Sequence, residues 1–342
     1  MKSAFLTEPR NIEIRETGMP VVKAYEVLVR IAYCGICTLE QRLYDGQRSI
    51  GYPIVPGHEA SGTVVSVGSE VIGPIKPGDH VVLDLVNRCH VCPACLSGNS
   101  NLCESRYAKG QQVLGAFSTY MAVKPQQIQV IPPSLPLEQA AFAEPLSCCI
   151  RSLRKVGASL GQTLLICGAG TLGLLHLKVA LAIGVRVIVC DIDGKRLQDA
   201  ARMGADLVVN PSDIVAFRDS VRKATDARGV ECAIVTSCAP SAASSALEVL
   251  APGGKLNIYT SYGDKPPLPV DMHTIHRNEY MITGSEGRNE SDFFCAVRAL
   301  AYGKIVVDDL ISNIYPLDEV GAALEKALAG NVYRVLLEMQ GT

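Results

Sequence analysis

Short apolar runs, separated by glycine and proline, fill the N-terminal part of the chain. The clearest of them are Val27–Tyr33, Ala60–Val67 and His80–Val86. Runs of this length, rich in β-branched residues and bounded by turn-forming residues, are typical of strands. From Lys2 to about Gln129 the pattern therefore predicts an irregular β-barrel.

The periodicity changes after Pro136. Leu137–Val156 is rich in Ala, Leu and Cys and predicts a helix, and from Gly161 onward apolar strands alternate with amphipathic helices. This alternation predicts a parallel sheet, and six strands suit a doubly wound dinucleotide-binding fold. The predicted strands are Thr163–Cys167, Val185–Cys190, Leu207–Val209, Cys232–Thr236, Lys255–Tyr259 and Tyr280–Thr283.

The C-terminal tail, beyond Gly284, departs from this alternation. Its predicted elements are a helix at Ser291–Tyr302, a strand at Ile311–Tyr315, a helix from Asp318 and a closing strand at Arg334–Glu338. We expect the tail to rejoin the first domain. The predicted domains are thus an irregular β-barrel domain of residues 1–145, completed by residues 286–342, and an inserted parallel-sheet domain of residues 146–285.

Length, composition and charge restrict the class of function. The chain has 342 residues, 48% apolar and 19% charged, which is too long for one core, since single domains mostly stop growing at about 250 to 300 residues. Its formal net charge is −2, and no run of Lys and Arg creates the positive field that nucleic acid or an anionic membrane needs. We therefore expect a small-molecule partner, and neither nucleic acid nor a membrane.

The chain shows no pattern typical of export or membrane insertion. Its start, Met1–Glu16, mixes charged and apolar residues and has no continuous apolar stretch like that of a signal peptide. Apolar runs such as Thr163–Cys167 are far shorter than the roughly 20 residues of a membrane-spanning helix. These features predict a cytoplasmic protein.

Four of the thirteen cysteines are clustered with the spacing C-x2-C-x2-C-x7-C, at Cys89, Cys92, Cys95 and Cys103. In a cytosolic chain of this size, clustered cysteines more often hold a metal than form disulfides. Four thiolates on one lobe, residues 88–104, can close a tetrahedron around zinc and leave no open position, so this zinc would be structural. An iron–sulfur cluster is the main alternative.

The segment Gly168–Gly173 has the pattern G-x-G-x-x-G between a predicted strand and a predicted helix. In this context Gly168 permits the tight turn, Gly170 lets the backbone approach a pyrophosphate, and Gly173 packs the helix on the strand. Asp191, 18 residues after Gly173 at the end of the next strand, can bind the ribose hydroxyls and would repel a 2′-phosphate. The pattern favours NAD over NADP; the alternative is an ordinary strand-to-helix turn with a surface aspartate.

Several further segments, in a defined order, carry a family resemblance. They are Cys34–Gly35–Ile36–Cys37, Gly57–His58–Glu59, Lys76–Pro77–Gly78–Asp79–His80–Val81, the four-cysteine lobe, Glu144–Pro145–Leu146–Ser147 and Gly168–Gly173. With these segments the chain resembles, over nearly its whole length, the zinc-dependent medium-chain dehydrogenase/reductase family. Within that family it is similar to the sorbitol (polyol) dehydrogenase and threonine dehydrogenase group.

The resemblance implies a GroES-like irregular β-barrel catalytic domain and a Rossmann domain, with two zinc ions per chain. It implies that Cys37 and His58 bind the catalytic zinc, that Glu59 is a ligand or an immediate neighbour, and that Glu144 takes the last protein position. A Glu at that last position points to the polyol group. By the same resemblance, Arg196 lies near the adenosine ribose and the backbone of Leu172 lies beside the pyrophosphate.

The relay that passes the substrate proton outward departs from the family pattern. Leu39 stands where relatives usually have Ser or Thr, Glu40 stands where Asp is usual, and Arg42 stands where His often completes the relay. Thr38, one residue earlier, is one substitute. A zinc-bound water with Glu59 or Glu144 is another.

The leading functional prediction is reversible, NAD-linked oxidation of a secondary alcohol (a polyol, sugar alcohol or cyclitol) to a ketone. Zinc would act as the Lewis acid that lowers the pKa of the alcohol. Two alternatives remain: an L-threonine-type 3-hydroxy amino acid dehydrogenase, and a non-catalytic NAD-binding protein that lost its proton relay. The resemblance also implies a homodimer or a homotetramer.

Overall fold

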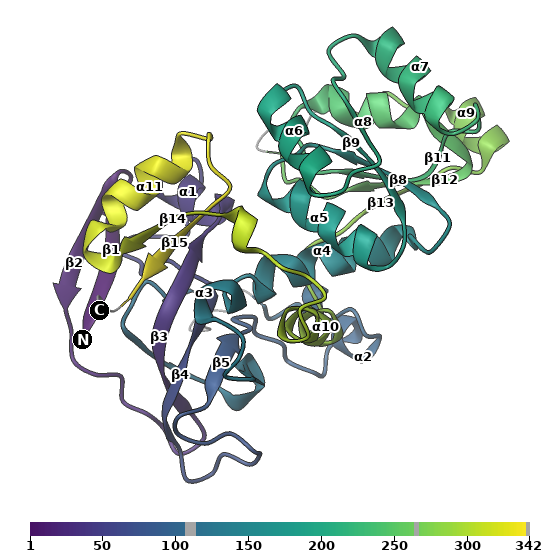
Figure 1. Ribbon diagram of the computed structural model, residues 1–342. Coiled ribbons are helices and arrows are strands. Elements are labelled where there is room, and N and C mark those ends of the chain that lie inside the picture. The colour runs from purple at the N-terminus through teal and green to yellow at the C-terminus, as the bar shows by residue number, and fades with distance from the viewer. Residues whose placement is uncertain (107–113, 263–266, 340–342) are drawn as a thin grey trace. The chain divides into compact units, whose positions relative to one another are not determined.

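The structure is a computed structural model that describes residues 1–106, 114–262 and 267–339. The chain forms two units (Figure 1). The first unit joins Met1–Pro145 to the C-terminal segment Asn289–Thr342, and the second is Leu146–Arg288. None of the helices in the described residues is long and apolar enough to cross a membrane.

The first unit is built on a seven-stranded sheet and a separate hairpin of β1 (Lys2–Glu8) and β2 (Asn11–Glu16). The strand order is β14-β15-β3-β4-β5-β7, and β6 also pairs with β3. Only the pair β14 and β15 is parallel within this sheet. The bounds are β3 (Val27–Ile36), β4 (Glu59–Val67), β5 (His80–Leu83), β6 (Tyr120–Val123), β7 (Ile128–Ile131), β14 (Ile311–Pro316) and β15 (Arg334–Glu338).

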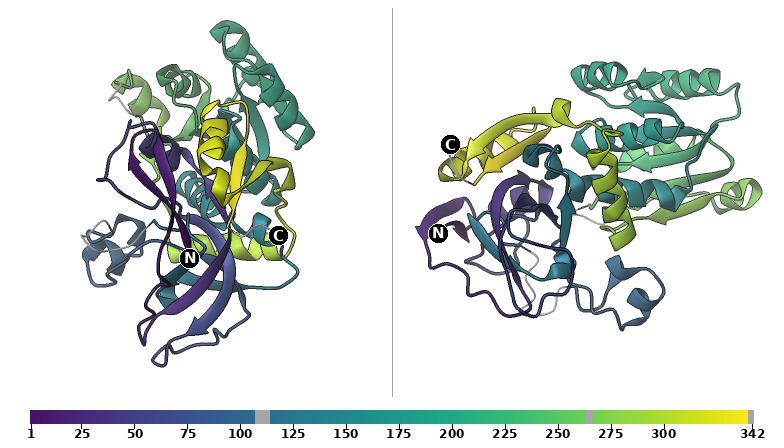
Figure 2. Two further views of the ribbon diagram at one scale, coloured as in Figure 1. Left: turned by 90° about the vertical axis from the view of Figure 1, so that its left-hand side faces the viewer. Right: turned by 60° about the horizontal axis from the view of Figure 1, so that its bottom comes forward.

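The C-terminal strand β15 pairs antiparallel with β3, from Val335 opposite Ile36 to Glu338 opposite Tyr33. In Figures 1 and 2 the yellow C-terminal strands accordingly lie beside the purple N-terminal ones. Both ends of the chain also share one hydrophobic core, which contains Leu6 as well as Leu337. The tail is therefore part of the first unit.

Short helices connect these strands. The predicted helix Leu137–Val156 is interrupted at Ala141–Phe142, which divides it into α3 and α4. The α-helices of the first unit are α1 (Thr38–Tyr44), α2 (Pro93–Leu96), α3 (Leu137–Ala140), α10 (Glu290–Ala301) and α11 (Val320–Leu328). Single 3-10 turns lie at Ser100–Leu102, Pro125–Gln127, Asp308–Leu310 and Leu317–Glu319.

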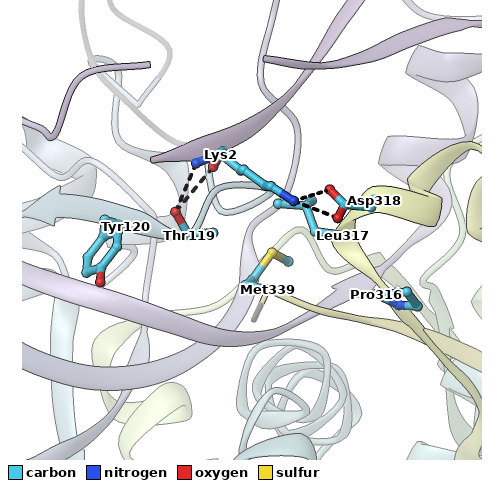
Figure 3. Close-up of a pocket in the computed structure, with 7 residues that line it drawn as sticks. All are labelled: Lys2, Thr119, Tyr120, Pro316, Leu317, Asp318 and Met339. Atoms are coloured by element: carbon cyan, nitrogen blue, oxygen red, sulfur yellow. Dashed lines mark hydrogen bonds and ion pairs between the residues drawn. The ribbon is translucent and has the colours of Figure 1, made fainter. Parts of the chain in front are cut away.

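A small pocket of about 330 Å³ lies where the two ends of the chain meet (Figure 3). Lys2 Nζ donates to the carboxylate of Asp318 at 2.6 and 2.9 Å, and the backbone N–H of Lys2 donates to Thr119 Oγ1 at 3.2 Å. Because Lys2 and Asp318 are both about half exposed, solvent screens this ion pair. The pocket therefore belongs to the packing of the chain ends.

The second unit contains the predicted six-stranded parallel sheet, in the order β10-β9-β8-β11-β12-β13. Several strand ends differ from the prediction by one to five residues, mainly at β11 and β12. The strands are β8 (Thr163–Cys167), β9 (Arg186–Cys190), β10 (Leu207–Val209), β11 (Val230–Val235), β12 (Leu250–Ile258) and β13 (Met281–Gly284). The helices are α4 (Ala143–Val156), α5 (Thr171–Ala182), α6 (Gly194–Arg202), α7 (Ile214–Ala224), α8 (Pro240–Leu247) and α9 (Met272–Asn278).

Both faces of this sheet are covered, which explains the continuous apolar runs of its strands. Leu165 and Cys167 of β8 belong to a core cluster with Phe217 of α7 and Ala243 of α8. Because successive side chains of a strand point to opposite faces, Ile166, which is also fully buried, points to the other face. The helices seen around the central sheet in Figure 1 thus bury it from both sides.

The strand order reverses between β8 and β11. From β8 the chain continues to β9 and β10 on one side, whereas β11 is followed by β12 and β13 on the other. Loops at the carboxyl ends of β8 and β11 therefore leave in opposite directions. Such a switch point is where open parallel sheets bind ligands.

Candidate active site and cofactor sites

Three candidate metal ligands meet in the first unit. The Sγ atom of Cys37, a ring nitrogen of His58 and a carboxylate oxygen of Glu59 lie within 4.8 Å of one another. Cys37 Sγ and His58 Nε2 are 3.7 Å apart. Cys37 follows β3 as the N-cap of α1, and Glu59 opens the neighbouring strand β4. The sheet thus brings together residues that their spacing in the sequence did not link.

Two glycines make room for this cluster. Gly57 has φ +98°, and a Cβ atom on it would lie 2.5 Å from the ring of Phe117. A Cβ atom on Gly35 would lie 2.1 Å from the carboxylate of Glu59. Neither position accepts a side chain without displacement of a neighbour, so both glycines are required by packing.

A buried carboxylate, Glu40, orients the histidine. Its Oε1 atom lies 2.7 Å from His58 Nδ1 and accepts the backbone N–H of Gly57 at 3.3 Å, and its Oε2 atom accepts the backbone N–H of Cys37 at 3.1 Å. Burial opposes ionisation of Glu40, but His58 lowers the pKa of this group below its usual value. Because Glu40 occupies Nδ1, the Nε2 atom is the one left for a metal.

The second carboxylate of the site, Glu59, is paired with an arginine from the C-terminal strand β15. Arg334 Nη2 lies 3.2 Å from Glu59 Oε1, and Arg334 Nη1 donates to the carbonyl of Ile36 at 2.8 Å. Both side chains are buried. Burial raises the pKa of Glu59 to about 7; Arg334 opposes this shift and Glu144 adds to it.

Glu144 lies beside the cluster. It stands in the first turn of α4, is 7% exposed, and is near enough to interact electrostatically with Glu59 and Arg334. It is not one of the three side chains whose ligand atoms lie within 4.8 Å of one another. The described structure therefore brings three of the four expected residues together and leaves the fourth next to them.

The cysteines of the lobe also come together. The Sγ atoms of Cys89, Cys92, Cys95 and Cys103 all lie within 4.8 Å of one another. Helix α2 starts after Cys92, and its single turn returns Cys95 to the group. Backbone N–H bonds from Val91 and Cys92 lower the pKa of Cys89 to about 6, which favours its thiolate.

In the second unit, the glycine segment forms a tight turn between β8 and α5. Gly168 has φ +110°, which favours glycine, and a Cβ atom on Gly173 would lie 1.8 Å from the carbonyl oxygen of Gly168. Helix α5 has Gly170 as its N-cap, with no side-chain hydrogen bond to its first N–H groups. These N–H groups and the helix dipole suit a phosphate.

Asp191 lies at the other side of this turn, directly after β9. Its carboxylate accepts the backbone N–H of Ala169 at 2.7 Å and that of Asp193 at 2.9 Å. Arg196 stands in the first turn of α6, with its Nε atom 4.0 Å from the carboxylate of Asp193. The carbonyl of Leu172 accepts from Nδ1 of the buried His176 at 2.6 Å. The expected cofactor residues therefore lie on or next to the ends of β8 and β9.

Comparison with known proteins decides the family. Residues 23–133 match the alcohol dehydrogenase GroES-like domain, and residues 171–302 match the zinc-binding dehydrogenase family. D-Arabitol-phosphate dehydrogenase of Enterococcus avium is 32% identical over 330 residues, which cover 94% of this chain and 92% of that protein. Sorbitol dehydrogenase of Bacillus subtilis strain 168 is 32% identical over 334 residues, with coverages of 96% and 94%. The chain belongs to the zinc-dependent medium-chain dehydrogenase family.

A solved structure extends this match to the whole fold. A protein described as a zinc-binding dehydrogenase of Sinorhizobium meliloti 1021, bound to NADP, has a TM-score of 0.90 to this chain at 28% identity, with 99% of each chain covered. The predicted combination of a GroES-like domain with a Rossmann parallel sheet is confirmed. The prediction of a dehydrogenase that uses zinc and a nicotinamide dinucleotide is confirmed too, and a non-catalytic protein is not favoured.

Both donor sets fit zinc. Tetrahedral Zn–S bonds of about 2.3 Å hold thiolates about 3.8 Å apart, a spacing that the cysteines of the lobe can adopt with small shifts. Cys37, His58 and Glu59 offer a thiolate, an imidazole and a carboxylate, and a tetrahedral zinc held by these three would have one further position, for Glu144 or for an exogenous ligand. Among the described residues, these two sets are the groups that could hold a metal ion.

Two of the residues that depart from the family's relay pattern, Leu39 and Glu40, contact the candidate metal ligands. Leu39 packs its side chain against the core, and its backbone N–H donates to Cys37 Sγ at 3.1 Å. Glu40 remains a carboxylate and binds His58. Thr38 is exposed at the start of α1.

Sequence reasoning missed the roles of Glu40 and Arg334. The sequence pattern identifies Glu40 only as a departure from the relay, although a carboxylate three residues after a candidate metal cysteine is a usable signal. Arg334 was placed only at the start of the closing strand. Arg334 stands directly before the apolar residues Val335–Leu337, and a charged residue in that position of a strand indicates a buried ionic partner.

We expect Glu40→Gln to weaken binding of the catalytic zinc by about 10- to 100-fold, the usual effect of loss of the hydrogen-bonded partner of a metal-binding histidine. Titration with a competing chromophoric chelator measures this, and the zinc of the lobe is the internal reference. Asp45→Asn, at the C-cap of the same helix but paired with Arg10, is the matched control and should leave both affinities unchanged. Equal zinc affinity in Glu40→Gln and the native protein would contradict the assigned role of Glu40.

Proposed function

We propose that the chain catalyses reversible, NAD-linked oxidation of a secondary alcohol of a polyol, sugar alcohol or cyclitol to a ketone. The cluster of Cys37, His58 and Glu59, supported by Glu40 and Arg334, is the observation that carries this proposal. The polyol class is supported by the names of the arabitol-phosphate and sorbitol dehydrogenases. Those two names do not favour a 3-hydroxy amino acid, which is the second candidate.

We assign catalysis at the metal to one domain and binding of the dinucleotide to the other. Residues 1–145 with 286–342 would form the catalytic domain, with the structural zinc in the lobe at residues 88–104. Residues 146–285 would bind the dinucleotide. The metal-ligand cluster in the first unit and the glycine turn in the second unit support this division.

When bound, zinc supplies a Lewis acid that lowers the pKa of an alcohol, and the nicotinamide ring accepts a hydride. The side chains of the protein prepare the site for this chemistry. Glu40 holds His58 in one tautomer, and Arg334 compensates the charge of Glu59 so that this carboxylate can stay buried. Glu144 is the candidate for the remaining protein position at the metal.

The proton of the alcohol must leave by a route other than the side chain of Leu39. This side chain is apolar and packs on the core. An apolar group neither accepts nor donates a proton, so the usual hydroxyl relay does not operate through this position.

Zinc content and NADH formation test the function together. We expect two zinc ions per chain in the native protein and one in Cys37→Ser, with NADH formation from one or more polyols lost in the variant. The substrate panel pairs free polyols with their phosphates and includes L-threonine. Cys92→Ser, which removes a lobe ligand instead, is the comparison variant and should also lose one zinc.

Two results would contradict the proposal. One zinc ion in both the native protein and Cys37→Ser, without NADH formation from any panel member, would exclude the catalytic metal site. Turnover of L-threonine well above that of every polyol would favour the second candidate.

Asp191 supports NAD over NADP. Its carboxylate is held next to the glycine turn by the N–H groups of Ala169 and Asp193. A fixed negative charge at this point binds ribose hydroxyls and repels a 2′-phosphate.

We expect Asp191→Asn to lower the ratio of kcat/KM for NAD to that for NADP by about 10- to 100-fold, since a hydrogen bond to a charged group contributes about 1.5 to 3 kcal/mol. Asp193→Asn, which changes the exposed N-cap of α6, should leave this ratio nearly unchanged. Equal use of NAD and NADP by the native protein would refute the assignment.

We also propose that the chain forms at least a homodimer through β13. This strand is the edge of the parallel sheet, and Met281 and Ile282 on it are 58% and 38% exposed. Exposed apolar edge strands tend to pair with another chain. Sedimentation should show a dimer or tetramer for the native protein and a monomer for Met281→Lys/Ile282→Lys, with Val215→Lys on α7 as the surface control. A native monomer would refute this.

A cytoplasmic location is supported by the reduced thiols that the site needs. Five of the thirteen cysteines are candidate zinc ligands, a role that requires reduced thiols. Such ligands persist in a reducing compartment. Fractionation of the source cells checks this location, and recovery with an oxidising compartment would contradict it.

A further inference from the structure

The glycine turn that follows β8 is held from the side of β9 by two hydrogen bonds. The N–H of Gly168 donates to the carbonyl of Cys190 at 2.7 Å, and the N–H of Ala169 donates to Asp191 at 2.7 Å. These bonds orient the start of the turn. Neither of these two bonds involves the carbonyl oxygen of Gly168.

Thr236, at the carboxyl end of β11, holds the turn from the opposite side. β11 is the neighbour of β8 across the point where the strand order reverses (Figure 1). The hydroxyl of Thr236 lies 3.1 Å from the carbonyl oxygen of Gly168 and 3.1 Å from that of Cys167, and its proton is shared between them. The backbone N–H groups of Thr236 and Ser237 also donate to the Cys167 carbonyl, at 2.9 and 3.0 Å.

The glycines of the motif leave the space that this hydroxyl occupies. A Cβ atom on Gly168 would lie 2.7 Å from Thr236 Oγ1, and one on Gly173 would lie 3.2 Å from the same atom. The same hydroxyl thus fits against both glycines, close to the first turn of α5. A change in its position would move the carbonyl of Gly168, against which Gly173 packs.

We propose that Thr236 is a positioning residue for the dinucleotide. Its hydroxyl fixes the Gly168 peptide, and through it the angle at which α5 presents its first N–H groups to the pyrophosphate. Thr236 itself need not touch the cofactor. This inference rests on the dinucleotide-binding part of the proposed function and is independent of the substrate.

The test is calorimetric titration of the zinc-loaded protein with NAD, without substrate. Thr236→Val keeps the shape of the side chain but removes the hydroxyl. We expect it to raise the Kd for NAD by about 3- to 10-fold, the range for one neutral hydrogen bond. Thr236→Ser retains the hydroxyl and should restore a Kd within about twofold of the native value. In steady-state assays the KM for NAD should rise in Thr236→Val while the KM for the alcohol stays unchanged.

Thr225→Val separates positioning from general stability. The Thr225 hydroxyl also binds backbone, donating to the carbonyl of Val221 at 2.9 Å and accepting the N–H of Gly229 at 3.1 Å, but it lies at the end of α7. Its loss should lower the unfolding temperature and leave the Kd for NAD unchanged.

Three results would overturn the proposal: an unchanged Kd in Thr236→Val, an equal loss of affinity in Thr225→Val, or failure of Thr236→Ser to restore binding. If the native protein binds neither NAD nor NADP, dinucleotide binding itself fails, and this proposal with it. Normal binding by the native protein together with any of the three results refutes the role of Thr236 alone.

Discussion

The antiparallel ladder between β15 and β3 is the constraint on which the candidate active site depends. Strand β3 lies between β15 and β4 in the sheet, so the ladder brings Arg334 from the C-terminal end of the chain to Glu59 at the start of β4. A carboxylate buried without a partner is costly, and loss of one member of a buried pair destabilises strongly. The C-terminal tail is thus as much a part of the site as the segments that supply the metal ligands.

Near this ladder, each of the three clustered candidate metal ligands has a supporting partner. Glu40 holds His58, the N–H of Leu39 donates to Cys37 Sγ, and Arg334 holds Glu59. Such support fixes the orientation of ligands before a metal binds, which reduces the cost of ordering them during binding. The residues that depart from the family's relay pattern, Leu39 and Glu40, thus both support candidate metal ligands.

In the second unit, the turn before α5 must hold the first backbone N–H groups of this helix in a fixed direction. A helix N-terminus binds phosphate through these groups only if the preceding turn is rigid. Here the turn is held by hydrogen bonds from β9, through Cys190 and Asp191, and from β11, through Thr236. Gly168 and Gly173 are needed because Thr236, after β11, approaches both of them closely, and Gly173 also packs against the carbonyl of Gly168.

By itself, the sequence determined the features that short segments encode. The six parallel strands followed from apolar periodicity, the turn at Gly168 from the G-x-G-x-x-G pattern between a strand and a helix, and the four-cysteine group from spacing on one lobe. Glu40 and His58, or Glu59 and Arg334, share no such local pattern, since their contacts depend on which strands become neighbours and in which register. Only the tertiary structure decided these pairs and the contact of Thr236 with Gly168, because burial and hydrogen bonding between distant segments arise when the sheets assemble.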